Sequence, residues 1–245
     1  MTEPLRQRPT PNQPVQRFTR SELAQHWALL VTLTVLALTG LALFAHGTWV
    51  GRLLLALEGG LASRGILHRI FAVALMLVVV WHLLYILFTE RGHRQFLAML
   101  PHRRDLADLA ELLAYYRGRC PEPPAFGRFT PLQKLQYWGA GIGSVMMIAT
   151  GLVLWFHTKT MALLPKWVID VTTIVHGYEG LILFMLLFGW HLYIVHLSPG
   201  NCPLQRTFLT GTISAERLFQ EHRREYEELF GPHEPAEQAQ PGGPQ

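Results

Sequence analysis

Five histidines lie within or at the ends of long apolar stretches, at spacings that suit haem binding. His68 and His82 lie in one stretch, and His176 and His191 lie in another with one residue more between them. If this stretch is an α-helix, it rises about 21 Å between position 68 and position 82. Its rotation over the same distance brings the two side chains back to within about 40° of each other. Imidazole is a common axial ligand of haem iron. Each stretch could therefore present one ligand near each face of a bilayer, and His26, near the start of a third stretch, could add another.

These histidines need helices that cross a membrane, and the sequence predicts four. Half of the 245 residues are hydrophobic and only 16% are charged. About 20 apolar residues suffice to cross a hydrocarbon core of about 30 Å. Four nearly uncharged stretches are long enough, namely 24–46, 66–88, 135–157 and 172–196. We therefore expect an all-α membrane protein whose core is a four-transmembrane-helix bundle.

The distribution of basic residues predicts how the bundle is oriented. Of the 21 Lys and Arg residues, 16 lie before the first stretch, in the loop 89–134 or after the last stretch, and five lie on the opposite side. Cytoplasmic loops carry an excess of Lys and Arg. Both termini and the loop 89–134 are therefore predicted to be cytoplasmic, in a multi-pass protein of the inner (plasma) membrane. The pI of about 9.3 then reflects topology and contact with anionic lipid, not nucleic-acid binding.

The segments outside the spans form few predicted elements. We divide the chain into a disordered N-terminal tail (1–16), a haem-binding transmembrane domain (17–200) and a cytoplasmic C-terminal tail (201–245), whose Pro-, Gln- and Gly-rich end is also expected to be disordered. Leucines at helical spacing in 103–116 predict a short amphipathic helix on the cytoplasmic surface.

The two cysteines give no sign of another redox centre. Cys120 and Cys202 both fall on the predicted cytoplasmic side, where disulfides are rare. The chain has no CxxC or CxxCH motif, which argues against an iron–sulfur cluster and against covalently attached c-type haem.

The two halves of the chain resemble each other, which predicts two duplicated helical hairpins. The motif RFT at 17–19 recurs at 128–130, and the motif TGL at 39–41 recurs at 150–152, so both motifs repeat at the same offset. The second helix of each half carries the tripeptide WHL near its end. We interpret the repeat as two hairpins related by a pseudo-twofold axis along the membrane normal.

This symmetry sorts the histidines by depth. The second and fourth helices run in the same direction, so His68 and His176 lie at the outer level, whereas His82 and His191 lie at the inner level. The first helix runs the opposite way, so His26 also lies at the inner level. Tyr137 takes the place of His26 in the second half. A six-coordinate haem needs two ligands, and three inner histidines compete for two positions.

The residues HW at 26–27, the two TGL motifs, VHGYEG at 175–180 and WHLYIV at 190–195 resemble the diheme cytochrome b family. That family includes the membrane cytochrome b subunits of formate dehydrogenase and nickel–iron hydrogenase. The resemblance covers residues 17–200 and implies two haem b groups. It implies that His68 and His176 hold the outer haem, and that His26 and His191 hold the inner haem.

His82 is a departure from this family pattern. The internal symmetry favours His82 and His191 as the inner ligands, whereas the resemblance favours His26 and His191. The histidine that does not bind iron would support a ligand or contact a quinone. Charged residues near the spans could also serve the haems: Arg17, Arg20, Arg69 and Arg128 are candidates to pair with propionates. Glu179 is a candidate for proton handling or for an ion pair with Arg69.

The resemblance implies electron transfer between a partner subunit and membrane quinone, as part of a respiratory oxidoreductase complex. No residue is predicted to carry out bond chemistry. One alternative is a transmembrane ferric reductase that uses the same haems, and another is a metal transporter with histidine ligands. Metal sites of the second kind cluster three or four ligands around one ion, whereas these histidines separate into two levels. A haem-free membrane anchor is the remaining alternative.

Overall fold

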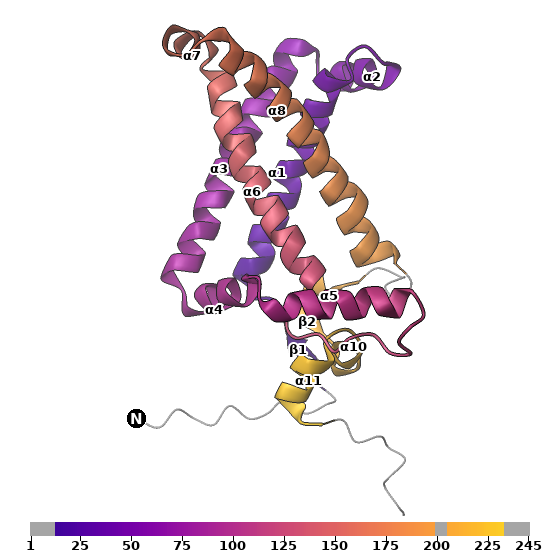
Figure 1. Ribbon diagram of the computed structural model, residues 1–245. Coiled ribbons are helices and arrows are strands. Elements are labelled where there is room, and N and C mark those ends of the chain that lie inside the picture. The colour runs from indigo at the N-terminus through magenta and orange to yellow at the C-terminus, as the bar shows by residue number, and fades with distance from the viewer. Residues whose placement is uncertain (1–12, 199–204, 233–245) are drawn as a thin grey trace, which may run out of the picture.

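The computed structural model describes residues 13–198 and 205–232, and four long apolar helices dominate it (Figure 1). The first three spans are α1 (Arg20–Phe44), α3 (Leu61–Phe88) and α6 (Pro131–Trp155). The fourth is α8 (Lys166–Phe184), continued by the π-helical segments η1 (Met185–His191) and η2 (Tyr193–Leu197). All four are long and apolar enough to cross a membrane. The predicted all-α bundle of four spans is confirmed.

The spans pack as two hairpins, each begun by the same helix-capping motif. Helix α1 packs along α3, and α6 packs along α8. Thr19 caps the start of α1 in a capping box with Glu22, and Thr130 does the same for α6 with Gln133. A capping box satisfies backbone N–H groups that the first helical turn leaves without partners. The threonine of the repeated RFT motif therefore starts the first helix of each hairpin.

Shorter helices lie at both ends of the bundle (Figure 1). Helices α2 (Trp49–Leu57) and α7 (His157–Leu163) lie at the predicted outer end, and neither helix was predicted from the sequence. At the other end lie α4 (Glu90–Met99) and α5 (Arg103–Tyr116), the latter with the bounds predicted for the amphipathic helix. Lys134 holds α5 against α6 through Asp105, at 2.9 Å.

The π-helical part of the fourth span explains the unequal histidine spacing. The histidines of the second span stand at positions 68 and 82, whereas those of the fourth, at 176 and 191, are one residue further apart. A π-helix turns by roughly 80° per residue, because its hydrogen bonds span five residues in place of four. Nine α-helical steps and six π-helical steps therefore turn the chain through about the same angle as fourteen α-helical steps. Segment η1 absorbs the additional residue and keeps His191 on the face of His176.

The chain on either side of the spans folds into a small cap at the inner end. Strand β1 (Val15–Gln16) pairs antiparallel with β2 (Thr212–Ile213), which follows α9 (Thr207–Thr210). Helices α10 (Ala215–Glu221) and α11 (Arg223–Phe230) enclose an apolar core centred on Leu218, which is completely buried. Val15 and Gln16 were expected to be disordered, but they form a strand because β2 provides their backbone partners. Residues 1–12, 233–245 and Cys202 lie outside the described residues.

A buried charge cluster, the arginine clamp (Arg17, Arg128, His222 and Glu225), ties this cap to both halves of the bundle. The Glu225 carboxylate accepts from Arg17 through one oxygen and from Arg128 through the other. Arg17 also donates to the backbone carbonyl of Arg128, and Arg128 to that of Arg17. The two equivalent arginines of the RFT repeat thus exchange hydrogen bonds across the pseudo-twofold axis. Their guanidinium groups are engaged by Glu225, so the structure does not support their predicted role at haem propionates.

The clamp shifts the pKa values of its own acid and imidazole. Burial alone would raise the pKa of Glu225, but Arg17 and Arg128 together hold it below its ordinary value. Burial and the neighbouring Arg17 guanidinium lower the pKa of His222 to about 4. His222 Nδ1 lies 2.7 Å from the carbonyl oxygen of Gly127, and Nε2 lies 3.0 Å from Arg17 Nη2. The imidazole is therefore neutral, donating through Nδ1 and accepting through Nε2.

Candidate functional site

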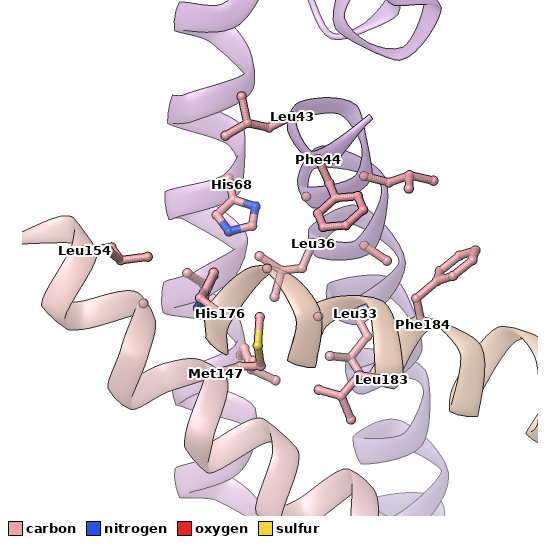
Figure 2. A pocket seen from close by; sticks show the side chains of 18 of the residues that line it. Leu33, Leu36, Leu43, Phe44, His68, Met147, Leu154, His176, Leu183 and Phe184 are labelled. Atoms are coloured by element: carbon pink, nitrogen blue, oxygen red, sulfur yellow. The ribbon is translucent and has the colours of Figure 1, made fainter. Parts of the chain in front are cut away.

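The outer histidines, His68 on α3 and His176 on α8, face each other across the bundle (Figure 2). Their ring centroids are 6.3 Å apart, with ring planes inclined by 73°. A metal–imidazole bond of about 2 Å, with the nitrogen about 1.1 Å from its ring centroid, would place two axial imidazoles with centroids about 6.2 Å apart. The observed spacing therefore leaves room for one iron atom between the two rings.

A cavity of about 590 Å³ surrounds this pair, which is within the usual range for a cofactor pocket. Its walls come from all four spans and are mainly apolar (Figure 2). Gly40 and Gly151, the glycines of the two TGL motifs, form part of the wall. A Cβ atom on Gly151 would lie 3.2 Å from His176 Cε1. Glycine at this position therefore lets α6 approach the ring of His176 closely.

Two arginines line the same cavity and provide the positive charge that a propionate requires. Arg64 donates to the backbone carbonyl of Thr39 at 2.7 Å, and the Arg69 guanidinium lies 5.7 Å from the ring centroid of Trp155. The predicted ion pair between Arg69 and Glu179 is absent from the described part of the chain. Glu179 packs instead against Gly143 of α6, where an added Cβ would lie 3.0 Å from its Oε1.

Each outer histidine has a threonine partner on the first helix of its own hairpin. Thr39 Oγ1 lies 2.7 Å from His68 Nδ1, and Thr150 Oγ1 lies 2.8 Å from His176 Nδ1. These threonines occupy equivalent positions in the two TGL motifs. The contact of these threonines with the histidines was not predicted from the sequence, although their recurrence in both halves was a usable signal.

The inner level brings His26 of α1 and His191 of η1 together. Their ring centroids are 6.5 Å apart and their planes are inclined by 51°, so the pair has nearly the same spacing as the outer pair. The Nδ1 atom of His191 is buried and has no hydrogen-bond partner among the described residues. A buried polar atom without a partner is unusual in a folded protein. The spacing of the two rings fits an imidazole pair that receives a metal.

His82 lies at the same level but makes different contacts. Its Nδ1 lies 2.8 Å from Gln25 Oε1, and its Nε2 lies 3.0 Å from the Tyr137 hydroxyl. Both ring nitrogens are thus hydrogen-bonded. By the sequence repeat, Tyr137 and His82 are the counterparts of His26 and His191. At the position that the repeat makes equivalent to the His–His pair, the bundle therefore has a hydrogen-bonded His–Tyr pair, with His82 from the first hairpin and Tyr137 from the second.

His196 lies closer to the inner pair than expected. On a regular α-helix its side chain would point about 140° away from that of His191. The π-helical turns reduce this angle, and the His196 and His26 rings both contact Phe208, with centroids 5.1 and 6.4 Å from it. His196 is therefore part of the wall around His26.

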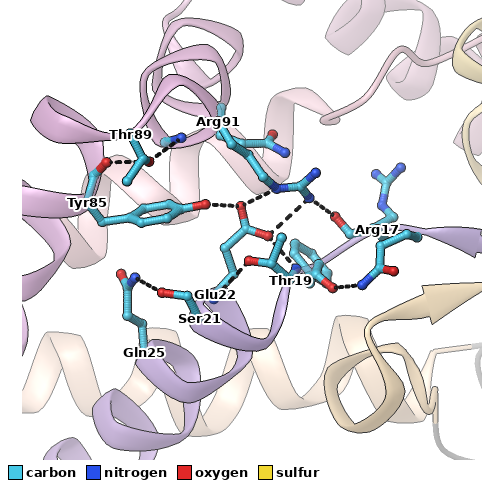
Figure 3. A network of polar contacts seen from close by, with 12 residues as sticks. Arg17, Thr19, Ser21, Glu22, Gln25, Tyr85, Thr89 and Arg91 are labelled. Atoms are coloured by element: carbon cyan, nitrogen blue, oxygen red, sulfur yellow. Dashed lines mark hydrogen bonds and ion pairs between the residues drawn. The ribbon is translucent and has the colours of Figure 1, made fainter. Parts of the chain in front are cut away.

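A polar network beneath the inner level fixes the start of α1 against the end of α3 (Figure 3). Glu22 accepts from the Tyr85 hydroxyl at 2.9 Å and from Arg91 Nε at 3.0 Å. Arg91 also donates to the backbone carbonyl of Arg17 at 2.9 Å. This network sets the depth and rotation of the helix that carries Gln25 and His26.

Comparison with known proteins identifies the family. The sequence model of the family described as prokaryotic cytochrome b561 matches the chain twice, over residues 2–102 and over residues 101–199. The chain belongs to the prokaryotic cytochrome b561 family. No curated protein matches the chain.

Membership in the cytochrome b561 family settles the cofactor class. The family binds b-type haem, and membership implies haem-mediated electron transfer through a membrane. The resemblance to membrane cytochrome b subunits is thereby confirmed. The two imidazole pairs and the apolar cavity between glycine-bearing helices fit such a group.

Proposed function

We propose that the protein carries electrons through the membrane by two haem b groups, between a redox partner at the outer end and quinone at the inner end. This proposal is supported by the distances between ring centroids in the two histidine pairs. They are 6.3 Å for His68 with His176 and 6.5 Å for His26 with His191. The two pairs lie at different depths along the spans. Haem iron supplies reversible one-electron chemistry when it is bound.

The protein residues hold, orient and insulate these groups. Two ligands on different helices fix each ring plane, and the apolar walls of the outer cavity exclude water. Arg64 and Arg69 line this cavity and would neutralise propionates. Burial, axial-ligand identity and hydrogen bonds to the imidazoles are the means by which a protein adjusts a haem potential.

We assign the inner ligands as His26 and His191 and give His82 a different role. His82 and Tyr137 form a polar pair in an apolar surrounding, and Gln25 links this pair to the residue next to His26. A quinone headgroup needs hydrogen-bonding groups in such surroundings. We therefore propose that this pair contributes to the quinone site.

The proposed orientation places the cap and both termini in the cytoplasm, in the inner membrane of the cell. The cap, α4 and α5 lie at one end of the bundle, which agrees with the basic segments sharing one side (Figure 1). Quinone reduction at this end would draw its protons from the cytoplasm. A redox subunit of a larger complex would meet the outer haem at the other end.

Haem quantitation of the purified protein tests this proposal. We expect two b-type haems per chain in the reduced-minus-oxidised spectrum, and quinol analogues should reduce them. Oxidation of the reduced haems by ferric chelates, without any response to quinol, would favour the ferric reductase. In the described residues, no three His, Cys, Asp or Glu side chains come together, whereas a zinc site needs three or four protein ligands. A preparation without haem would contradict the proposal.

Separate His26→Ala and His82→Ala variants test the inner ligand assignment. His26→Ala should retain one haem per chain, because only the inner pair loses a ligand. His82→Ala should retain both haems and lose part of its rate of reduction by quinol. The reverse pattern of haem loss would assign the inner haem to His82.

A further inference from the structure

The two TGL threonines make the same unusual set of contacts in the two halves of the bundle. Thr39 Oγ1 contacts His68 Nδ1 and also lies 2.7 Å from the carbonyl oxygen of Val35. Thr150 Oγ1 contacts His176 Nδ1 and lies 2.7 Å from the carbonyl oxygen of Met146. Both hydroxyl groups thus connect an outer histidine to the backbone one turn earlier.

These contacts determine which ring nitrogen carries the proton. A threonine hydroxyl has one hydrogen, and the backbone carbonyl four residues earlier can only accept it. The threonine oxygen must then accept from the histidine, so Nδ1 carries the ring proton. Nε2 is left with its lone pair, which is the atom that a neutral imidazole offers to a metal.

We propose that Thr39 and Thr150 are a matched pair of positioning residues that set the tautomer, orientation and donor strength of both outer haem ligands. The inference rests on the proposed function. An Nδ1–H group that donates to an acceptor makes the imidazole a more basic ligand. A more basic ligand stabilises ferric over ferrous iron and so lowers the haem potential. His191, by contrast, has a buried Nδ1 with no partner in the described residues, so the effect belongs to the outer haem.

The experiment uses the purified haem-loaded protein and redox titration. Thr39→Val and Thr150→Val keep the shape of the side chain and remove the acceptor. Each should raise the ratio of reduced to oxidised outer haem at a given potential by about threefold to tenfold, tenfold being about 59 mV for one electron. The two single variants should shift this ratio similarly, and the double variant should shift it further. Repeating the titration in the His26→Ala background leaves only the outer haem and makes the assignment unambiguous.

Thr34→Val is the matched control, because Thr34 is also on α1 and its hydroxyl bonds the carbonyl of Leu30 at 2.7 Å. It should leave both potentials unchanged. Thr39→Ser restores the acceptor and should return the potential to that of the unmodified protein. Loss of the outer haem in Thr39→Val that Thr39→Ser repairs would also support the proposal.

Three results would overturn the inference. They are an unchanged outer potential in both valine variants, an equal shift in Thr34→Val, or a defect that serine does not repair. In each of these three cases the unmodified protein still contains haem. Failure of the proposed function would instead show as an unmodified protein without haem.

Discussion

At the scale of single residues, the groups that each imidazole contacts distinguish the histidines better than their depth along the spans does. His26 and His82 lie at the same predicted level, yet His26 faces another imidazole, whereas both nitrogens of His82 are hydrogen-bonded. Metal ligands commonly donate their second ring nitrogen to a fixed acceptor. His68 and His176 have this arrangement through Thr39 and Thr150. The residue type alone therefore does not identify a ligand.

Gly151→Val tests the close approach of α6 to the outer pair. The new Cβ would lie 3.2 Å from His176 Cε1, and its methyl groups would extend further into the cavity. We expect haem content to fall from about two to about one per chain, with the inner haem retained. Gly141→Val, on the same helix but with open space around the added Cβ, is the control and should keep both haems. Full haem content in both variants would show that this glycine does not shape the site.

The neutral state of His222 predicts how stability depends on pH. Its pKa of about 4 in the folded protein is below the ordinary 6.5, so the unfolded chain binds the proton more readily. The contribution to stability is complete above pH 6.5 and is lost as the pH falls through 4. Between pH 6.5 and 5 the loss should be about 2 kcal/mol.

Thermal unfolding in detergent at several pH values would measure this loss. His222→Asn cannot titrate but can still donate to Gly127, so its unfolding midpoint should change little between pH 6.5 and 5. His93→Asn, at an exposed position, should keep the pH dependence of the unmodified protein. Equal pH dependence in His222→Asn would show that His222 is not the responsible group. The contribution of Glu225 is separate, because it is lost only as the pH falls below about 4.5.

At the scale of elements, the fourth span combines two kinds of helix because it carries one residue more than the second. The α-helix α8 places His176, and the π-helical η1 brings His191 to the same face. π-helical turns commonly occur at functional sites. Here the smaller rotation per residue also directs His196 toward Phe208 and the surroundings of His26.

Deleting Met185 tests whether η1 compensates for the additional residue. Met185 is 61% exposed, and its removal makes the separation of His176 from His191 equal to that of the two histidines in the second span. The segment should become α-helical, and both haems should remain. Deleting Val31 from α1, an α-helix that carries no additional residue, should rotate His26 by about 100° relative to Thr39 and remove one haem. Haem spectra of the two deletions provide the measurement, and loss of the inner haem on deleting Met185 would refute the explanation.

At the scale of the whole molecule, the arginine clamp joins the two hairpins and the C-terminal segment at one point. Glu225 is the shared acceptor for the equivalent arginines of both halves. The Arg17 residue is only 5% exposed, so its charge depends on this partner. The clamp therefore fixes the inner ends of α1 and α6 relative to each other, and with them His26 and Tyr137.

Glu225→Gln should destabilise the protein strongly. It leaves two adjacent guanidinium groups without a counter-charge, and loss of one partner from a buried ion pair costs about 3–5 kcal/mol. We expect a lower unfolding midpoint in detergent and faster proteolysis of the cap. Glu216→Gln, which removes an exposed carboxylate of α10, serves as the control. Similar stability of the two variants would contradict the proposed role of the clamp.

Much of the fold follows from sequence pattern alone. The four spans, the amphipathic helix at 103–116 and the two-hairpin repeat depend on local hydrophobicity and on internal similarity, both of which a single chain displays. The short helices α2 and α7 and the cap were not foreseen. Their residues lack long periodic patterns, and the cap depends on pairing between Val15 and Ile213, which lie far apart in the chain.

The sequence by itself determined the depths of the histidines, because helical rise converts residue spacing into distance along the membrane normal. Only the tertiary structure decided which imidazoles face one another, because rotation about a helix axis depends on packing between helices. One additional residue in the fourth span would have turned His191 by about 100° on a regular helix. The π-helical turns prevented this, and the contacts with Gln25 and Tyr137 directed His82 away from the inner pair.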